Sequence, residues 1–174
     1  MKHPAPLTRR LRVLAGACAA LALVVAAPAA AVDAGAPAPG FALPDRAGEI
    51  ISLEKMRGRV VYVDFWASWC GPCRQSFPWM SEMQRKYGAK GFTVLAVNVD
   101  KRDADAQRFL QQVPAAFTIV YDPKGQVPAA YGVKAMPNSF LIDAEGRVAN
   151  VEYGFKDERK AELEREIAAL VAAH

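Results

Sequence analysis

Apolar residues fall along this chain in short β-branched runs that alternate with stretches of helical spacing. The clearest run, Val60 to Phe65, is broken only by Asp64 and predicts a buried strand. Further strands are predicted over 92–99, 117–121, 138–142 and 148–153, and helices over 73–87, 103–113, 127–131 and after Asp157. Strands that alternate with helices predict an α/β domain built on a central sheet.

Two short apolar segments precede this alternation. Residues 41–44 and 49–53 flank a turn over 45–48, which predicts a β-hairpin ahead of the main sheet. The residues before it, 32–40, are small and proline-rich, and we interpret them as a flexible linker. A chain of 174 residues is one domain by size, so the folded unit is expected over 41–174.

The first 31 residues, 1–31, have the layout of a secretory signal peptide. A basic start is followed by an Ala-rich apolar run over 13–27 and by Ala29-Ala30-Ala31 as a small-residue cleavage site. The run is short for a spanning helix, but an uncleaved membrane anchor stays open as the alternative. A twin-arginine signal at Arg9-Arg10 and a lipoprotein site at Cys18 fit their surroundings less well. We therefore expect export and a periplasmic location.

Charge argues against one class of partner. The whole chain carries 22 basic and 18 acidic residues, but four of the basic residues and none of the acidic ones lie in the first 31 positions. The remainder of the chain is formally neutral. We therefore expect no basic patch for nucleic acid.

Cys70 and Cys73 follow the predicted central strand where the next helix begins. Pro72 suits a first-turn position of that helix, and the positive end of a helix dipole favours a thiolate. Two intervening residues allow a disulfide, and the spacing is typical of dithiol chemistry. Half of a zinc site is the alternative, but structural zinc needs four ligands. Beyond residue 31 there is no third cysteine and the only histidine is His174, so we expect no metal.

The stretch from Asp64 to Arg74, Asp-Phe-Trp-Ala-Ser-Trp-Cys-Gly-Pro-Cys-Arg, resembles the active-site segment of thioredoxins. Pro78 matches a proline inside the first helix of that family, and Pro137 matches a proline that carries a cis peptide bond and faces the cysteines. The hairpin and the long connection over 100–136 resemble the TlpA/ResA-like branch of the superfamily. The resemblance implies a thioredoxin fold, a central mixed sheet flanked by helices. It also implies an N-terminal β-hairpin and an extra βα insertion between the active-site half and the cis-proline.

A mechanism follows from the cysteine pair and its surroundings. Cys70 attacks a substrate disulfide, and the more buried Cys73 then resolves the mixed disulfide. Asp64 is the candidate base for the Cys73 proton, because burial raises the pKa of a carboxyl; a satisfied polar group without a role is the alternative. Thioredoxins pair this aspartate with a lysine, whereas alignment on residues 98–100 puts Ala96 there. We therefore expect Asp64 to be hard to ionise.

Five further residues are expected to contact the substrate. Met136, next to Pro137, would offer its backbone N–H and C=O to an extended segment in a small β-augmentation. Trp69, Gly71 and Pro72 adjoin the cysteines in sequence. The methionine at position 136 differs from the isoleucine or threonine expected there. This difference concerns which protein partner the site selects.

These features predict an exported thiol-disulfide oxidoreductase whose only redox group is the Cys70–Cys73 disulfide, with no added cofactor. Glycine and proline between the cysteines resemble the reducing members of the superfamily. The expected activity is therefore reduction of disulfides in periplasmic proteins, for example apocytochrome c. A membrane thiol-electron donor of the DsbD/CcdA kind would supply electrons, and a monomer is expected. The alternatives are a dithiol oxidase or isomerase, a thiol peroxidase and a copper-delivery protein.

Overall fold

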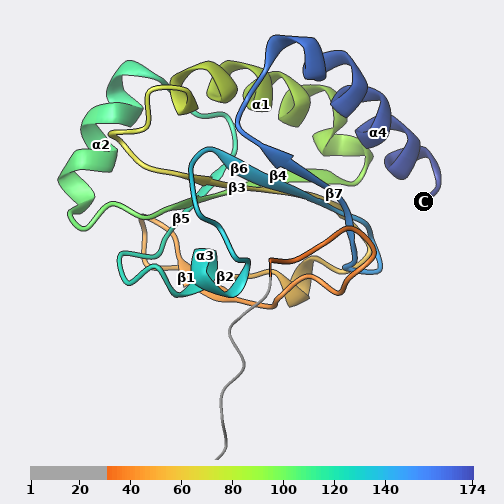
Figure 1. Ribbon diagram of the computed structural model, residues 1–174, viewed down its shortest axis with the longest axis horizontal. Coiled ribbons are helices and arrows are strands. Elements are labelled where there is room, and N and C mark those ends of the chain that lie inside the picture. Colours follow the sequence, from red (N-terminus) through yellow and green to blue (C-terminus); the bar gives the residue numbers. More distant parts are fainter. Residues whose placement is uncertain (1–30) are drawn as a thin grey trace, which may run out of the picture.

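The structure is a computed structural model that describes residues 31–174, so residues 1–30 of the predicted signal peptide lie outside the described residues. A five-stranded sheet forms its centre (Figure 1), in the order β5-β4-β3-β6-β7. The strands are β3 (Val60–Trp66), β4 (Phe92–Asn98), β5 (Thr118–Tyr121), β6 (Asn138–Ile142) and β7 (Val148–Tyr153). β3, β4 and β5 run parallel, and β6 pairs antiparallel with both β3 and β7. The predicted central mixed sheet is confirmed.

β3 is buried on both faces. All seven of its residues are buried, and alternate side chains belong to two separate apolar clusters. Tyr62 and Trp66 belong to one cluster, and Val61, Val63 and Phe65 belong to the other. A nearly continuous apolar strand is typical of a parallel sheet that is covered on both sides. The break in this pattern, Asp64, therefore lies in the interior.

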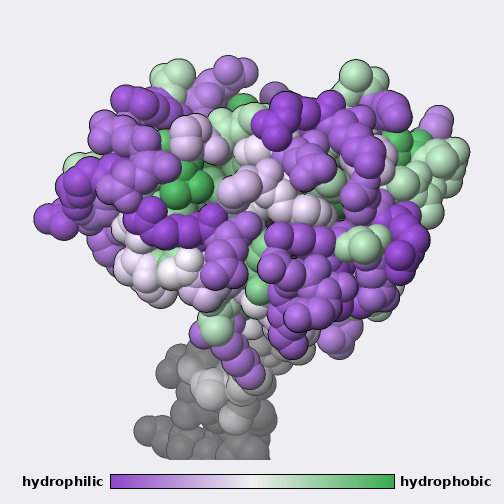
Figure 2. Space-filling model, turned by 90° about the horizontal axis from the view of Figure 1, so that it is seen from above, coloured by the Kyte–Doolittle hydropathy of each residue, from purple (hydrophilic) through white to green (hydrophobic). Residues whose placement is uncertain are grey.

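Helices α1 (Cys73–Tyr87), α2 (Asp103–Gln112) and α4 (Lys160–Ala172) cover one face of the sheet (Figure 1). Trp66 joins two of them to β3, because its ring centroid lies 4.9 Å from that of Phe77 on α1 and 4.8 Å from that of Phe109 on α2. The outer surface of this side is mainly hydrophilic, with small apolar patches between the polar groups (Figure 2). The helices thus show the two-sided character expected of a surface layer.

The opposite face is covered by the hairpin β1 (Ala42–Pro44) and β2 (Ile50–Ser52) together with α3 (Gln126–Ala130), which lie below the sheet in Figure 1. Tyr131 fills the centre of this layer, with its ring centroid 4.8 Å from that of Phe140 and 5.3 Å from that of Phe65. Its hydroxyl donates to the Pro39 carbonyl at 2.8 Å. The predicted N-terminal hairpin is therefore present and packs on the main sheet.

The connection between β4 and β6 holds α2, β5 and α3. β5 extends the sheet at its edge and runs parallel to β4, with Thr118 opposite Leu95. The extra βα insertion is therefore confirmed. Three short 3-10 turns complete the part of the chain that the structure describes: η1 (Glu54–Met56), η2 (Gly88–Lys90) and η3 (Asp157–Arg159). Because η3 occupies the positions after Asp157, the final α-helix begins later than expected, at Lys160.

Residues 32–40 differ from the predicted flexible linker. The Gly35 N–H donates to the Val148 carbonyl at 2.7 Å, and the Val148 N–H donates to the Ala36 carbonyl at 2.9 Å. Pro37 forms an isolated antiparallel bridge with Arg147. The expectation was wrong because even a small, proline-rich segment carries backbone donors and acceptors, and the edge strand β7 offers partners for them.

Candidate active site

The cysteine pair lies at the corner between β3 and α1. β3 ends at Trp66, and α1 begins at Cys73 with Pro72 as the residue before it. The Cys70 N–H donates to the Ala67 carbonyl at 3.0 Å, which turns the chain between strand and helix. The two cysteines form a disulfide, with their Cα atoms 5.4 Å apart. The structure therefore brings together the pair that the spacing predicted, at the N-terminus of a long helix.

Cys70 and Cys73 differ in their access to solvent. Cys73 is fully buried, whereas 4% of Cys70 is exposed. The neighbours of Cys70 lie at the surface: Trp69 is 71% exposed, and Gly71 and Pro72 are exposed as well. A partner disulfide that approaches this surface meets Cys70 first. Of the two buried cysteines, Cys70 is thus the one nearer to solvent.

A buried carboxylate, Asp100, holds the loop that leads to Cys70. Its Oδ2 accepts from the Ser68 N–H at 2.9 Å, and its Oδ1 accepts from the Ser68 hydroxyl at 2.9 Å. The Asn98 side-chain amide also donates to Oδ2, at 2.8 Å. Sequence reasoning missed this cluster, because Ser68 and Asp100 lie 32 residues apart and meet only through the pairing of β3 with β4.

The peptide bond between Met136 and Pro137 is cis, as the resemblance implied. β6 begins at the next residue, Asn138, which pairs with Phe65 close to the end of β3. Pro137 therefore lies beside the strand end that leads to the cysteines. Met136 packs against the apolar cluster that contains both Cys70 and Cys73.

A groove of about 370 Å³ runs along this segment. It is lined by Ala31, Gly132, Lys134, Ala135, Met136, Pro137, Asn138, Tyr153 and Gly154. Tyr153 is 67% exposed, which is unusual for a large aromatic side chain in the described part of the chain. The sequence analysis did not identify Tyr153, and its only signal was an aromatic residue at the last position of a predicted strand. The groove joins Met136 and Pro137, two of the predicted substrate-contacting residues, in one depression.

Asp64 is wholly buried in the middle of β3. The Ser139 hydroxyl on β6 donates to its Oδ1 at 2.6 Å, and its Oδ2 has no hydrogen-bond partner among the described residues. Burial raises the pKa of Asp64 to about 7, and the hydrogen bond from Ser139 acts against this rise. A carboxyl of this acidity can exchange a proton near neutral pH. The residue opposite Asp64 on β4 is Ala96, as the alignment predicted.

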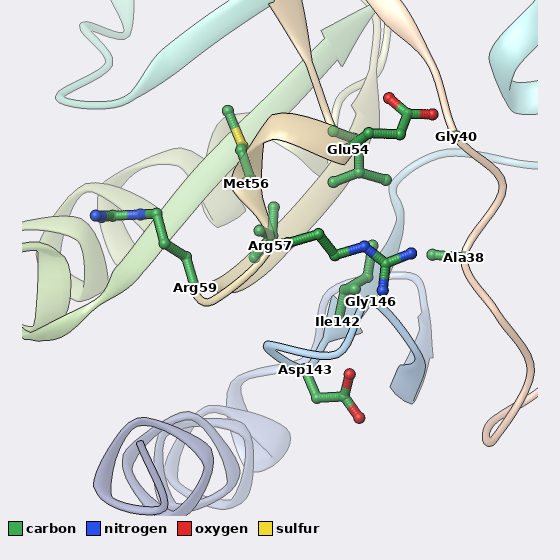
Figure 3. A pocket seen from close by; sticks show the side chains of 11 residues that line it. Ala38, Gly40, Glu54, Met56, Arg57, Arg59, Ile142, Asp143 and Gly146 are labelled. Carbon is green, nitrogen blue, oxygen red and sulfur yellow. The ribbon is translucent and has the colours of Figure 1, made fainter.

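A smaller cavity of about 90 Å³ lies at the other end of β3. Figure 3 shows Arg57 reaching across it, with Glu54 on one side and Asp143 on the other. Arg59, just before β3, and Val61, near its beginning, form part of the wall of this cavity, whereas the cysteines follow the end of the same strand. This cavity is therefore separate from the thiol site.

The described residues offer few other reactive groups. Within residues 31–174, no group of three or more His, Cys, Asp or Glu side chains is placed to hold a metal ion. His174 contacts Glu145 in the turn between β6 and β7, at 3.4 Å. In the same part of the chain, no helix combines the length and apolarity needed to cross a membrane.

Known proteins resemble this chain over most of its length. The Redoxin family model matches residues 33–167. The thiol-disulfide oxidoreductase ResA of Geobacillus thermodenitrificans is 38% identical over 136 residues, which cover 77% of this chain and 78% of that protein. ResA of Bacillus subtilis is 35% identical over 123 residues, which cover 71% and 69%.

A solved structure gives the same result. The crystal structure of a Chlorobium tepidum protein, assigned as the thiol:disulfide interchange protein DsbE, is 57% identical and superposes with a TM-score of 0.78 over 81% of this chain and 99% of that one. The Cys70–Cys73 disulfide supplies the chemistry that these relatives are named for. The chain therefore belongs to the Redoxin family and is a thiol-disulfide oxidoreductase of thioredoxin fold, similar to the ResA proteins.

Proposed function

We propose that this oxidoreductase reduces disulfides in proteins outside the cytoplasm. The observation that carries the proposal is the identity of Gly71 and Pro72, the exposed residues between the cysteines, which have no ionisable side chain. Strong dithiol oxidases owe their high potential, about −120 mV, to a stabilised reduced form. Gly71 and Pro72 contribute no such stabilisation, which favours a low potential and therefore the donation of electrons to substrates.

In the proposed reaction, the Cys70 thiolate attacks one sulfur of a substrate disulfide, and the other substrate sulfur leaves as a thiolate. Cys73 then attacks Cys70, the mixed disulfide breaks, and the second substrate thiolate is released. Asp64 accepts the Cys73 proton in this second step. Its complete burial and its pKa of about 7 support this role.

The substrate segment would lie in extended form along the groove at Met136. The backbone N–H and C=O of Met136 would pair with it as an added strand, while Trp69 and Tyr153 would contact its side chains. Both aromatic side chains are largely exposed, at 71% and 67%. Tyr153 lines the groove and Trp69 adjoins Cys70 in sequence, and exposed aromatic residues are typical of surfaces that bind a protein partner.

The proposed setting is the periplasm. The signal-like residues 1–31 support export, either with cleavage or as an anchor. A protein that works as a reductant in an oxidising compartment needs an outside source of electrons. A membrane thiol-electron donor of the DsbD/CcdA kind would fill this need, and apocytochrome c is the substrate that the family resemblance suggests. The protein would act as a monomer without a bound metal.

The reduction potential of the Cys70–Cys73 pair tests the direction of electron flow. The protein is equilibrated with thiol/disulfide buffers of graded potential, and the reduced fraction is measured by alkylation and mass spectrometry. We expect a value near that of thioredoxin, about −270 mV. A value near about −120 mV would make the protein an oxidase and overturn the proposal. The double variant Cys70→Ser/Cys73→Ser, which has neither thiol of the pair, is the control for alkylation outside the pair.

A further inference from the structure

Four residues lie side by side across four neighbouring strands at the level of Asp64. Ala96 on β4 pairs with Asp64 on β3, and Asp64 pairs in turn with Ser139 on β6. Ser139 pairs with Glu152 on β7. Because directly paired residues project to the same face of a sheet, these four side chains form one row, the Asp64 row, on the face covered by α1 and α4.

The residues at the two ends of the Asp64 row, Ala96 and Glu152, offer no hydrogen-bond donor to the Asp64 carboxylate. Ala96 brings only a methyl group. Glu152 is itself engaged, since it forms an ion pair with Arg159 and accepts from the Asn150 side-chain amide at 3.2 Å. Within the row, Ser139 is therefore the neighbour that offers Asp64 a hydrogen-bond donor.

The two oxygens of Asp64 are not equivalent. Oδ1 accepts from the Ser139 hydroxyl at 2.6 Å, a short distance typical of an O–H donor on a charged acceptor. Oδ2 has no partner in the described part of the chain, although the side chain is wholly buried. Buried polar atoms are almost always hydrogen-bonded, so an unpartnered one calls for a functional explanation.

This inference rests on the base role proposed above for Asp64. We propose that Ser139 is a positioning residue for Asp64: its hydroxyl holds Oδ1 and stabilises the carboxylate, which leaves Oδ2 as the oxygen that takes the Cys73 proton. A cation at the Ala96 position would favour a charged Asp64 through its own charge, whereas in this chain the Ser139 hydroxyl acts through a hydrogen bond. It favours the charged form of the buried aspartate.

The step itself balances in atoms and electrons. The Cys73 S–H gives its proton to Asp64 Oδ2, directly or through one water. The Cys73 thiolate then attacks the Cys70 sulfur of the mixed disulfide, so that the Cys70–Cys73 bond forms and the bond to the substrate breaks. The substrate leaves as a thiolate, and the cysteine pair has lost the two electrons that the substrate disulfide gained.

The groups around Asp64 support this assignment. Tyr62 on β3 and Cys73 on α1 belong to the apolar cluster on the same face of the sheet. Glu152 on β7 and Glu166 on α4 act on the pKa of Tyr62, to which Ser139 is also hydrogen-bonded, and Arg159 pairs with Glu152. Burial, followed by the charge of Asp64, raises the pKa of Tyr62, so this phenol stays neutral beside the carboxyl. For Asp64 itself, Ser139 is the neighbour that lowers the pKa which burial raises.

The pH dependence of the resolving step tests the proposal. Reduced protein is mixed with dithiobis(nitrobenzoate). Cys70 releases the first thionitrobenzoate, and attack by Cys73 releases the second, which stopped-flow absorbance records. In the wild-type protein we expect the second rate to rise around pH 7. In Ser139→Ala the rise should move to higher pH by roughly one pH unit, because a hydrogen bond to a charged group is lost.

Three further variants separate the hydroxyl from its volume and from the rest of the row. Ser139→Thr and Ser139→Val have nearly equal volume and differ by a hydroxyl against a methyl group. The Thr variant should keep the wild-type profile, and the Val variant should shift as Ser139→Ala does. Glu152→Gln should leave the midpoint in place. The proposal would be overturned if the pH profiles of Ser139→Ala and Ser139→Val superimposed on the wild-type profile. Equal shifts of the midpoint in Ser139→Thr and Ser139→Val would overturn it as well. Where Ser139→Val does not fold, Ser139→Ala decides.

Failure of the proposed function has a different signature. A wild-type protein that releases no second thionitrobenzoate does not carry out dithiol exchange between Cys70 and Cys73. An Asp64→Asn variant with the wild-type profile shows that Asp64 is not the base. When Asp64→Asn abolishes the rise near pH 7 and Ser139→Ala leaves it unchanged, the inference about Ser139 alone is rejected.

Discussion

Asp64 and Ala96 face each other across the parallel pair β3–β4, so the buried carboxylate has only a methyl group on that side. Both residues are wholly buried. Burial is therefore the main influence on the acidity of Asp64, opposed by the hydrogen bond from Ser139.

A cation placed at Ala96 should make Asp64 a stronger acid. In Ala96→Lys, an ammonium beside the carboxylate favours its charged form, and the midpoint of the resolving step should move below pH 7. The larger side chain should also lower the free energy of unfolding by about 1–3 kcal/mol, because Ala96 is fully buried. Ala96→Met controls for volume. It should lose stability without moving the midpoint, and a midpoint that moves equally in both variants would contradict the argument.

Stability should depend on pH through Asp64. The unfolded chain releases this proton near pH 3.8 and the folded protein near pH 7, so the folded state binds more protons between these values and loses stability as pH rises. Asp64→Asn removes this loss. The free energy of unfolding of the variant should exceed that of the wild type by about 4 kcal/mol at roughly pH 8. Below roughly pH 4 the two free energies should be almost equal. Urea denaturation measures both. Asp33→Asn, a change at an exposed carboxylate, is the control, and a gain for Asp64→Asn that is the same at both pH values would refute the assignment.

The loop before Cys70 should depend on Asp100. Asp100→Ala removes the acceptor of three hydrogen bonds from Ser68 and Asn98 and leaves the buried Asn98 amide and the partly buried Ser68 donors unsatisfied, at a cost of about 2–3 kcal/mol in unfolding free energy. Ser68→Ala removes one of these bonds and should cost about 1 kcal/mol. Both variants should also slow the first attack by Cys70, with Asp100→Ala the slower. Attack rates equal to wild type in a destabilised Asp100→Ala would limit Asp100 to a role in stability.

The two cysteines should differ in what they trap. Cys73→Ser keeps the more exposed thiol but cannot resolve a mixed disulfide, so it should accumulate as an adduct with an oxidised protein substrate. Cys70→Ser leaves only the fully buried Cys73 and should form little adduct. Non-reducing electrophoresis and mass spectrometry distinguish the two results. Equal adduct formation by both variants would reverse the assigned order of attack.

Much of the fold follows from local patterns. The run from Val60 to Phe65 predicted a central strand, and the Cys-x-x-Cys spacing placed the disulfide at its end. The cis bond before Pro137 was expected from a family resemblance alone, since most X-Pro bonds are trans. These features depend on residues close together in sequence or on a motif with few alternative interpretations.

The parts that escaped prediction depend on strand register. Ser139 contacts Asp64 across 75 positions, and Asp100 contacts Ser68 across 32. The sequence around a serine in a strand does not indicate which residue it will contact. A shift of one residue in the strand register would turn its side chain to the other face of the sheet. The segment 32–40 escaped for a related reason, since its composition says nothing about an unpaired strand edge beside it.

The pairing of residues 32–40 with β7 also shortens the distance that can separate the thiol site from the part of the chain ahead of residue 31. A free coil of that length would allow on the order of 16 Å between its ends. Held by the bonds of Gly35 and Ala36 to Val148, the segment contributes almost none of this length. In a protein retained at a membrane, the residues ahead of 31 alone would set the distance from the membrane at which Cys70 meets its electron donor and its substrates. Lengthening that portion would change the encounter rates. Insertions after residue 40 would not.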